Sequence, residues 1–473
     1  MTGRPSSPRP RGRREPRPYR RPRPDEPRTV AFELLRAVDE RDAYANLALP
    51  ALLRERGLGG RDAAFATELA YGTLRWRGTY DAVLGACVDR PLAQVDPPVL
   101  DLLRLGAHQL LQMRVPDHAA VGATVELARS VSGDGRASFV NAVLRRVAAR
   151  DLTGWLGEVA PDRDRDLAGH LAVATSHPRW VVDAVHDRLG DWGQTEAMLR
   201  ADDEPPAVTL VARPGRADVA ALLAAGAEPG RWSPYAAVLP SGDPGDLELV
   251  RSGAVGVQDE GSQLASLALA RAEMDGPDRR WLDLCAGPGG KAALLAGLAA
   301  EHDAALLAVE VQPHRATLVR RALSGGTAAG WRTGVVVADG RAGPWRPGSY
   351  DRVLADVPCT GLGALRRRPE ARWRRRPADV AALVPLQRDL LRAALDAVRP
   401  GGVVGYVTCS PHVAETESVV RDVLRERGDV VRLDARDALP EVADLGAGPS
   451  VQLWPHVHGT DAMFICLLRR EPA

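Results

Sequence analysis

Apolar residues recur at two different spacings along this chain. Between residues 28 and 150 they return every three or four positions, as in Val30, Leu34, Leu35 and Val38, which is the period of an amphipathic helix. From about residue 256 onward, short apolar runs alternate with helix-like segments instead. The first region therefore predicts an all-α domain of five to seven helices, and the last region predicts an α/β domain.

The alternation after residue 256 fits a parallel sheet with helices on both faces. Its candidate strands are residues 280–284, 305–310, 333–338, 351–356 and 403–408. A doubly wound sheet of this kind binds its ligands at the carboxyl ends of the strands. At the end of the domain we expect an antiparallel pair of strands from residues 450–454 and 462–468.

The two remaining stretches follow neither pattern. Residues 1–27 are rich in arginine and proline, which predicts a disordered arm that serves either as a phosphate-binding tail or as a solubilising extension. Residues 151–255 mix helical patterns with short β-like runs, broken by proline and glycine. The predicted division is an arm (1–27), an all-α domain (28–150), a linker with a small α+β subdomain (151–255) and an α/β domain (256–473).

Composition excludes several classes of protein. The chain has 473 residues, 45% of them hydrophobic and 4% aromatic, so two or three domains must be packed mainly by aliphatic side chains. The five cysteines include no Cys-x-x-Cys pair, so we expect neither a disulfide framework nor a bound metal. No apolar run reaches the roughly 18 residues of a membrane span, and the N-terminus lacks the apolar segment of a signal peptide. We expect a monomeric cytoplasmic protein that does not associate with membranes.

One stretch of the α/β domain contains the single lysine among 62 basic residues. It runs from Asp283 to Lys291 between a predicted strand and a predicted helix, and a glycine loop there presents backbone N–H groups to a polar ligand. The P-loop pattern fails because Ala292 follows the lysine, and the dinucleotide fingerprint is absent. Glu310, at the tip of the next strand, is placed to bind a pair of ribose hydroxyls. This favours a nucleoside cofactor without pyrophosphate, and S-adenosylmethionine before NAD.

Three further strand tips carry side chains suited to chemistry. The third strand ends at Asp339, which could bind a purine amino group; Asp356 and then Cys359 follow the fourth, and Cys409 follows the fifth. A thiolate that adds to carbon 6 of a pyrimidine makes carbon 5 nucleophilic enough to accept a methyl group. A carboxylic acid near ring nitrogen 3 can stabilise the developing charge, and a base must remove the carbon-5 proton. Asp356 and the two cysteines supply these groups, whereas an amino-group methyltransferase would need no cysteine.

An arginine-rich run, residues 366–376, lies between the two cysteine loops. Most charged runs are solvated surface, but this one follows a catalytic-type loop, and its tryptophan offers a stacking face amid phosphate-binding charge. We therefore predict that this run binds nucleic acid through Arg366, Arg367, Arg368, Arg372, Trp373 and Arg374.

These motifs together resemble the RsmB/Sun family of RNA cytosine-C5 methyltransferases. In the α/β domain the resemblance is carried by residues 257–263, 285–291, 356–359, 408–410 and 454–461. The NusB-like RNA-binding domain of the same family is similar to the helical region at residues 62–69, 118–121 and 141–145. The resemblance therefore covers nearly everything after the basic arm.

The resemblance implies roles for individual residues. Cys409 would be the nucleophile and Cys359 would assist product release, an order that the spacing alone leaves open. The family more often has alanine at the position of Gly287 and aspartate at that of Glu310, and Thr416 stands where it often has asparagine. S-adenosylmethionine would contact Cys285, Ala286, Gly287, Pro288, Gly289, Gly290, Lys291, Glu310, Asp339 and Asp356.

The expected activity is therefore the formation of 5-methylcytosine in RNA. The NusB-like fusion makes small-subunit (16S) ribosomal RNA the expected partner. Two alternatives remain: a transfer-RNA cytosine methyltransferase, and an antitermination-type RNA-binding factor with an inactive methyltransferase domain. The intact pair of cysteines disfavours the inactive factor, and the NusB-like domain and the cysteine order disfavour DNA as substrate.

Overall fold

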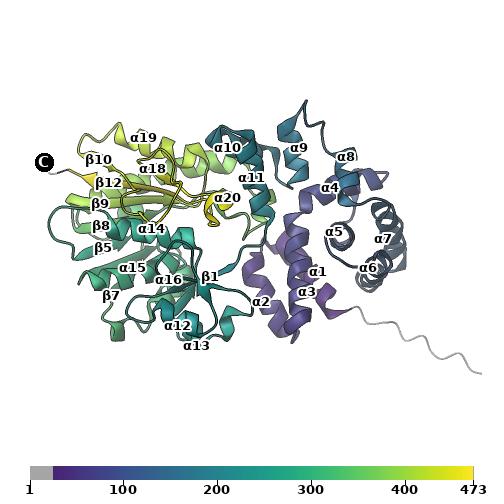
Figure 1. Cartoon of the computed structure of the whole chain (residues 1–473), viewed down its shortest axis with the longest axis horizontal. Helices are drawn as coiled ribbons and strands as arrows, with labels where there is room; N and C mark the ends of the chain where they lie inside the picture. The colour runs from purple at the N-terminus through teal and green to yellow at the C-terminus, as the bar shows by residue number, and fades with distance from the viewer. Residues whose placement is uncertain (1–24, 472–473) are drawn as a thin grey trace, which may run out of the picture.

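The computed structural model describes residues 25–471, which form an elongated molecule with a helical domain at one end and a sheet-containing domain at the other (Figure 1). Most of the predicted basic arm lies outside the described residues. The first helix begins at Glu26, and the Asp25 carboxylate caps it by accepting a hydrogen bond from the backbone N–H of Arg28. The predicted combination of an all-α domain, a small α+β subdomain and an α/β domain is confirmed.

Seven α-helices form the helical domain, in agreement with the expected five to seven. They are α1 Glu26–Arg41, α2 Ala45–Glu55, α3 Gly60–Arg75, α4 Arg77–Cys87, α5 Pro97–Leu111, α6 Asp117–Ser132 and α7 Asp134–Val147. Leu34, Leu69, Leu102, Leu127 and Leu144 come from five of these helices and meet in one buried core. The three-to-four-residue spacing in the sequence thus marks the buried face of each helix.

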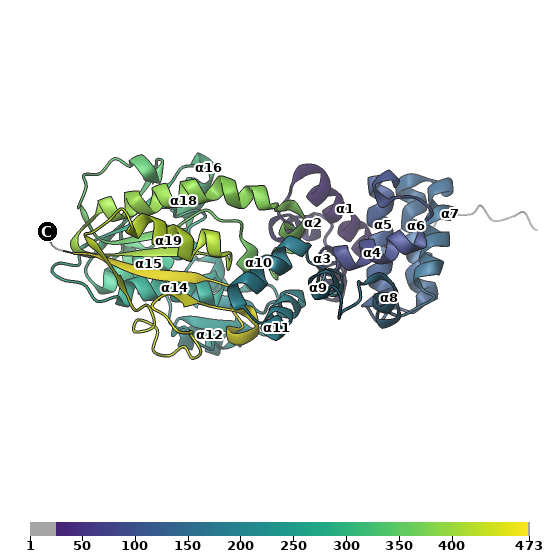
Figure 2. The same cartoon turned by 90° about the horizontal axis from the view of Figure 1, so that it is seen from above.

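The predicted linker begins with four more helices, α8 Leu152–Val159, α9 Leu167–Ala174, α10 Arg179–Leu189 and α11 Trp192–Asp203. Asp151, Asp166 and Asp191 precede three of them, and each carboxylate accepts a hydrogen bond from a backbone N–H three residues later. Helices α9 to α11 lie along the junction between the two larger domains in both views (Figures 1 and 2). Their core also includes Leu362 and Trp454 of the α/β domain, and Ser176, after α9, accepts a hydrogen bond from the backbone N–H of Gly78 in α4 (2.9 Å), so this segment joins the two ends of the molecule.

The predicted α+β subdomain is a four-stranded antiparallel sheet of order β2-β3-β1-β4. Leu210, Leu222, Ala237 and Val255 form its small core. Its elements are β1 Val208–Ala212, α12 Val219–Ala224, β2 Glu228–Pro229, β3 Ala236–Leu239, α13 Glu248–Arg251 and β4 Val255–Val257.

An eight-stranded mixed sheet forms the α/β domain. Its strands are β5 Arg280–Asp283, β6 Ala305–Glu310, β7 Arg332–Val337, β8 Tyr350–Asp356, β9 Val398–Thr408, β10 Val430–Leu433, β11 Val451–Gln452 and β12 Phe464–Arg470. Strands β5 to β9 pair in parallel, which confirms the five predicted strands, although β9 begins earlier than residue 403. Strand β12 is antiparallel to both β9 and β11, so the predicted closing pair is also confirmed.

Helices cover both faces of this sheet. They are α14 Glu260–Arg271, α15 Gly290–Glu301, α16 Pro313–Leu323, α18 Pro377–Ala397 and α19 Glu417–Leu424; the domain also contains two short helices, α17 Ala371–Arg374 and α20 Pro455–His458. Along β8, Leu354 lies in the core shared with α14 and α15, whereas Val353 and Ala355 lie in the core shared with α18 and α19. Successive side chains therefore point to opposite, equally covered faces. None of the helices within residues 25–471 is long and apolar enough to cross a membrane.

The strand order creates a topological switch point beside β5. From β5 the chain moves outward through β6 to β7, and then returns to β8 on the other side of β5. In doubly wound sheets, ligands bind outside the carboxyl ends of the strands at such a point. The loops after β5 and β8 should therefore hold the site.

Candidate active site

Five neighbouring strand ends carry the predicted site residues to one edge of the sheet. The glycine loop follows β5, Glu310 ends β6, Asp339 follows β7, Asp356 ends β8 and Cys409 follows β9. Because these strands are parallel, their carboxyl ends lie at the same edge. Residues that are far apart in the sequence therefore meet, as their positions at the strand tips predict.

The glycine loop leads directly into the N-terminus of α15. Gly289 has a φ of 113°, a value that glycine adopts more easily than other residues, and Gly290 is the first residue of the helix. The first amides of a helix have no partner within it, so they are available to a ligand. The loop thus has the conformation expected of a cofactor site.

Gly287 leaves room for the carboxylate at the end of β6. A Cβ atom at position 287 would overlap Oε2 of Glu310, which is only 4% exposed. The backbone N–H of Gln312 donates to Glu310 Oε1 (2.8 Å), and Arg315 donates to the Gly287 carbonyl (2.6 Å) while lying 3.5 Å from Glu310 Oε2. The absence of a side chain at Gly287 therefore leaves the space that the longer side chain of Glu310, compared with an aspartate, requires. Arg315 was not predicted, because no local motif marks it.

Lys291 and Asp356 form an ion pair between the first turn of α15 and the tip of β8. The Lys291 Nζ atom lies 2.9 Å from Asp356 Oδ2. Burial acts to lower the pKa of Lys291, but the Asp356 carboxylate outweighs it, so that the pKa is raised overall. The lysine therefore remains charged at neutral pH and holds the carboxylate beside the glycine loop.

Asp283 is a buried acid that the sequence did not single out as a site residue. Its Oδ1 accepts a hydrogen bond from the backbone N–H of Cys285 (3.3 Å), but its Oδ2 is buried without a partner among the described residues. Burial, followed by the charge of Asp356, raises the pKa of Asp283 to about 7. Buried polar atoms are normally paired, so this oxygen is available to a ligand donor.

The two predicted catalytic cysteines lie in contact. Their Sγ atoms are 3.3 Å apart, within hydrogen-bond distance for sulfur. With Cys359 as the donor, this bond lowers the pKa of Cys409 against the opposing effect of burial. The same bond, followed by burial, raises the pKa of Cys359 well above its ordinary value. The pair therefore favours a Cys409 thiolate beside a Cys359 thiol.

Asp339 presents an accessible carboxylate after β7. Arg341 donates to it from its side chain (2.6 Å) and from its backbone N–H (2.9 Å), and these bonds lower the pKa of Asp339. Because its side chain is 40% exposed, it can also accept a donor from a ligand. Among residues 25–471, no three His, Cys, Asp or Glu side chains gather as a metal site would require.

The arginine run does not lie on the surface as a whole, which corrects part of the RNA-binding prediction. Arg372 is fully buried in α17, where it bonds to the Asp203 carboxylate (2.7 Å), the Asp202 carbonyl (2.7 Å) and the Arg75 carbonyl (3.0 Å). Arg366 is also buried, between Asp259 (2.8 Å) and Asp461 (3.2 Å). These two guanidinium groups are buried and hydrogen-bonded to acceptors within the protein, so RNA cannot reach them.

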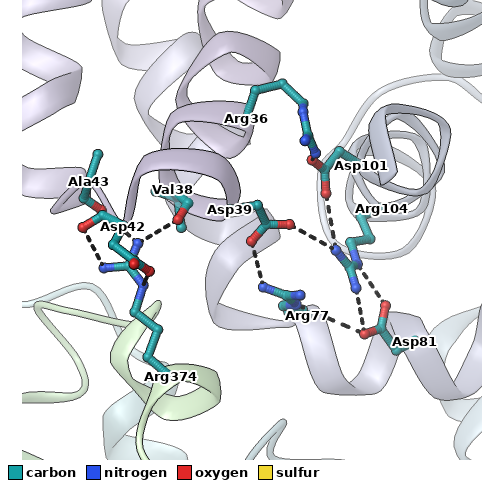
Figure 3. A network of polar contacts seen from close by, with 10 residues as sticks. All are labelled: Arg36, Val38, Asp39, Asp42, Ala43, Arg77, Asp81, Asp101, Arg104 and Arg374. Atoms are coloured by element: carbon teal, nitrogen blue, oxygen red, sulfur yellow. Dashed lines mark hydrogen bonds and ion pairs between the residues drawn. The ribbon is translucent and has the colours of Figure 1, made fainter. Parts of the chain in front are cut away.

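Two more residues of the run pack against the helical domain. Arg374 donates to the carbonyls of Val38 (2.7 Å) and Ala43 (2.8 Å) at the end of α1, as Figure 3 shows. The Trp373 ring lies against α4, where a Cβ atom on Gly78 would overlap it. Trp373, which we predicted to stack on nucleic-acid bases, and Arg374 therefore connect the α/β domain to the helical domain. Of the six predicted residues, Arg368 is exposed, and Arg367, Trp373 and Arg374 are partly exposed, with Arg367 paired with Asp461 and the other two packed against the helical domain.

The helix that Arg374 contacts is itself braced by ion pairs. Arg104 of α5 bonds to Asp101 (3.0 Å) and to Asp81 of α4 (2.7 Å), and Arg36 of α1 also pairs with Asp101 (2.5 Å; Figure 3). Asp101 and Arg104 are both nearly fully buried. Arg77 adds a bond to Asp39 of α1 (3.0 Å). This network fixes α1, α4 and α5 to one another, so Arg374 and Trp373 attach to a rigid unit.

Comparison with known proteins identifies the two larger domains. A family model described as 16S rRNA methyltransferase RsmB/F matches residues 269–469, and a NusB family model matches residues 25–149. The crystal structure of PH0851 shares the fold, with a TM-score of 0.77, 22% sequence identity, and coverage of 94% of this chain and 98% of that one.

Two curated relatives align with nearly the whole chain. A putative methyltransferase of Mycobacterium tuberculosis is 58% identical over 456 residues, which cover 96% of this chain and 98% of that protein. A probable ribosomal RNA small subunit methyltransferase B of Bacillus subtilis is 31% identical, over 94% of this chain and 98% of its own length. The relatives therefore share the helical domain as well as the α/β domain.

Proposed function

Because this chain belongs to the RsmB/F family of 16S rRNA methyltransferases, it is an S-adenosylmethionine-dependent RNA methyltransferase, and we propose that its product is 5-methylcytosine in 16S rRNA. The contact between Cys359 and Cys409 carries this proposal. Methylation at carbon 5 needs a thiolate that adds to the ring and is later expelled, and a thiolate–thiol pair supplies both needs. The NusB family match supports RNA as the partner of the helical domain.

Several features of the sheet edge fit S-adenosylmethionine. Glu310 can accept the two ribose hydroxyls, since Gly287 leaves space for its carboxylate. Asp339 can accept the adenine amino group. The N–H groups of Cys285 and Ala286 bond to Asp283 and to the Val309 carbonyl, so the later amides of the loop, from Gly287 to Lys291, are the ones that can bind the amino-acid part. The unpaired Oδ2 of Asp283 offers an acceptor for the cofactor ammonium group. When bound, the cofactor supplies an electrophilic methyl group.

We assign the steps at the cytosine ring to three side chains. The Cys409 thiolate adds to carbon 6, which moves electron density to carbon 5 and lets carbon 5 take the methyl group. We assign Asp356 to ring nitrogen 3, where it acts as a carboxylic acid and stabilises the developing charge by sharing a proton with that nitrogen; Lys291 orients it. After a base removes the carbon-5 proton, the bond to Cys409 breaks, and the neighbouring Cys359 assists its release as a proton donor.

RNA is expected to approach over the exposed part of the arginine run. Arg368 is exposed, with its guanidinium 5.6 Å above the ring of Tyr44 in the helical domain. Arg367 lies between Arg368 and the buried Arg366, and its charge acts on Cys409. We therefore restrict the RNA-binding proposal to Arg367 and Arg368, which can contact phosphates close to the reacting base.

The pairing of Gly287 with Glu310 leads to a testable prediction about cofactor affinity. We expect Gly287→Ala to raise the Kd for S-adenosylmethionine by roughly tenfold, because the new methyl group displaces the Glu310 carboxylate. Glu310→Asp should restore affinity to the Gly287→Ala protein, since the shorter acid leaves space for the Cβ atom. Isothermal titration calorimetry on the two single variants and the double variant measures this coupling. Additive losses would contradict it.

The proposed activity is tested with 16S rRNA and methyl-labelled S-adenosylmethionine. We expect label to appear in 5-methylcytosine after the RNA is digested to nucleosides and analysed by mass spectrometry. Transfer RNA serves as the competing substrate and should acquire no label. Label in another nucleoside, or in transfer RNA alone, would overturn the proposed specificity, and cofactor binding without any transfer would favour the RNA-binding factor.

A further inference from the structure

A buried carboxylate links the two cysteine loops. Glu415 lies in the short segment Val413–Glu415 that follows β9, and its side chain is fully buried. The backbone N–H of Thr360 donates to its Oε1 (2.8 Å), and the hydroxyl of Thr360 donates to its Oε2. The Ser410 hydroxyl also donates to Oε2 (2.7 Å). Thr360 and Ser410 directly follow the two cysteines, so one side chain binds both loops next to their sulfur atoms.

Further contacts hold Glu415 itself in place. Gln387 of α18 donates to Glu415 Oε1 (3.1 Å) and also to the carbonyl of Pro358 (2.9 Å), which precedes Cys359. Tyr406 of β9 donates its hydroxyl to the Glu415 backbone carbonyl (2.8 Å). The four donors to the carboxylate are neutral groups, so its charge is stabilised by hydrogen bonds alone. Burial of a carboxylate costs desolvation free energy. A role for Glu415 in a reaction step that depends on the positions of the two cysteines would explain why the buried carboxylate is present.

We propose that Glu415 is a positioning residue that holds the loops of Cys359 and Cys409 so that their sulfur atoms stay in contact. This inference rests on the proposed function, in which the contact makes Cys409 the nucleophile and Cys359 the proton donor. The negative charge of Glu415 acts on Cys359 and favours its thiol form, which is the form that donates to Cys409. Glu415 thus supports both the distance between the sulfur atoms and the direction of the hydrogen bond.

Other charges that face the sulfur pair come from neighbouring elements. Asp356 at the tip of β8 and Asp461 before β12 raise the pKa of Cys409, whereas Lys291 of α15 lowers it. The charge of Cys409 in turn contributes to the raised pKa of Arg367, so this guanidinium also lies within electrostatic reach of the pair. None of these groups makes hydrogen bonds to both cysteine loops. A change at Glu415 should therefore alter the contact between the cysteines while leaving these charges in place.

The first test needs no RNA. The pH dependence of alkylation by iodoacetamide is measured separately at Cys409 and Cys359 by peptide mass spectrometry. We expect Glu415→Gln to raise the apparent pKa of Cys409, because the amide cannot accept all four donors and the bond from Cys359 is lost. Removal of the Glu415 charge by itself would lower the apparent pKa of Cys359 and would not raise that of Cys409. The matched control is Glu417→Gln, because Glu417 pairs with Arg432 (3.1 Å) instead of the cysteine loops.

The second test uses the methyl-transfer reaction. For Glu415→Gln we expect kcat to fall by about 100-fold, as for a catalytic group displaced by about 1 Å, while the Kd for S-adenosylmethionine stays within twofold. An unchanged alkylation profile together with an unchanged kcat would overturn the proposal. If Glu415→Gln does not fold, Thr360→Val and Ser410→Ala each remove one hydroxyl donor, and an unchanged Cys409 profile in both would refute it. If the unsubstituted protein transfers no methyl group, the proposed function fails, but the alkylation profiles still decide the role of Glu415.

Discussion

Cys359→Ala is expected to trap a covalent complex between the protein and 16S rRNA. In this variant Cys409 can still add to carbon 6, but the thiol that assists its release is gone, so the adduct accumulates. The complex should appear as a retarded, labelled band after denaturing electrophoresis with methyl-labelled cofactor. Loss of the Cys359 hydrogen bond also removes the main effect that lowers the pKa of Cys409. Adduct formation should therefore require a higher pH than the reaction of the unsubstituted protein.

Two control variants make the trapping experiment decisive. Cys409→Ala should trap no RNA and should lose methyl transfer by roughly 10⁴- to 10⁶-fold, as when a catalytic nucleophile is removed. Cys87→Ala removes a buried thiol from the core of the helical domain and should behave like the unsubstituted protein in both assays. A trapped band in Cys409→Ala but not in Cys359→Ala would exchange the two roles and keep the reaction.

Replacement of Arg372 is expected to destabilise the junction between the helical and α/β domains. Arg372→Met keeps much of the length of the side chain but leaves the Asp203 carboxylate and the carbonyls of Asp202 and Arg75 without their donor. Removal of one partner of a buried ion pair typically costs about 3–5 kcal/mol in the free energy of unfolding. Because the side chain is fully buried, solvent does not replace the lost bonds.

The measurement combines thermal unfolding with limited proteolysis. We expect a lower melting temperature and faster cleavage in the helices that join the domains, since α11 loses its contact with α17. Arg368→Met is the matched control, because Arg368 belongs to the same run but is exposed, and its loss should cost less than about 1 kcal/mol. RNA methylation should fall in both variants, for loss of domain alignment in the first and loss of phosphate contact in the second. A melting temperature of Arg372→Met equal to that of Arg368→Met would contradict the structural role of Arg372.

Local sequence features predicted the sheet and the layout of its edge. Strands β5 to β9 are short apolar runs between helical patterns, and parallel strands necessarily bring their tips together. The glycine loop before Lys291, the acid Glu310 and the two cysteines could therefore be assigned to one edge without coordinates. These assignments depend on residues close in sequence, and that is why they succeeded.

The role of the arginine run could not be predicted from local sequence features. Seven arginines around a tryptophan have the composition of a nucleic-acid-binding surface, but Arg372 meets Asp203 at a separation of 169 residues, and Arg374 meets Val38 at 336. Glu415 and Arg315 show the same limit, because their importance lies in which distant loops they touch. The sequence by itself determined the elements, their order and the chemical groups at the strand tips. Only the tertiary structure decided which charges are buried between domains and which hydrogen bonds hold the cysteines together, because those acceptors are supplied by parts of the chain that meet only after folding.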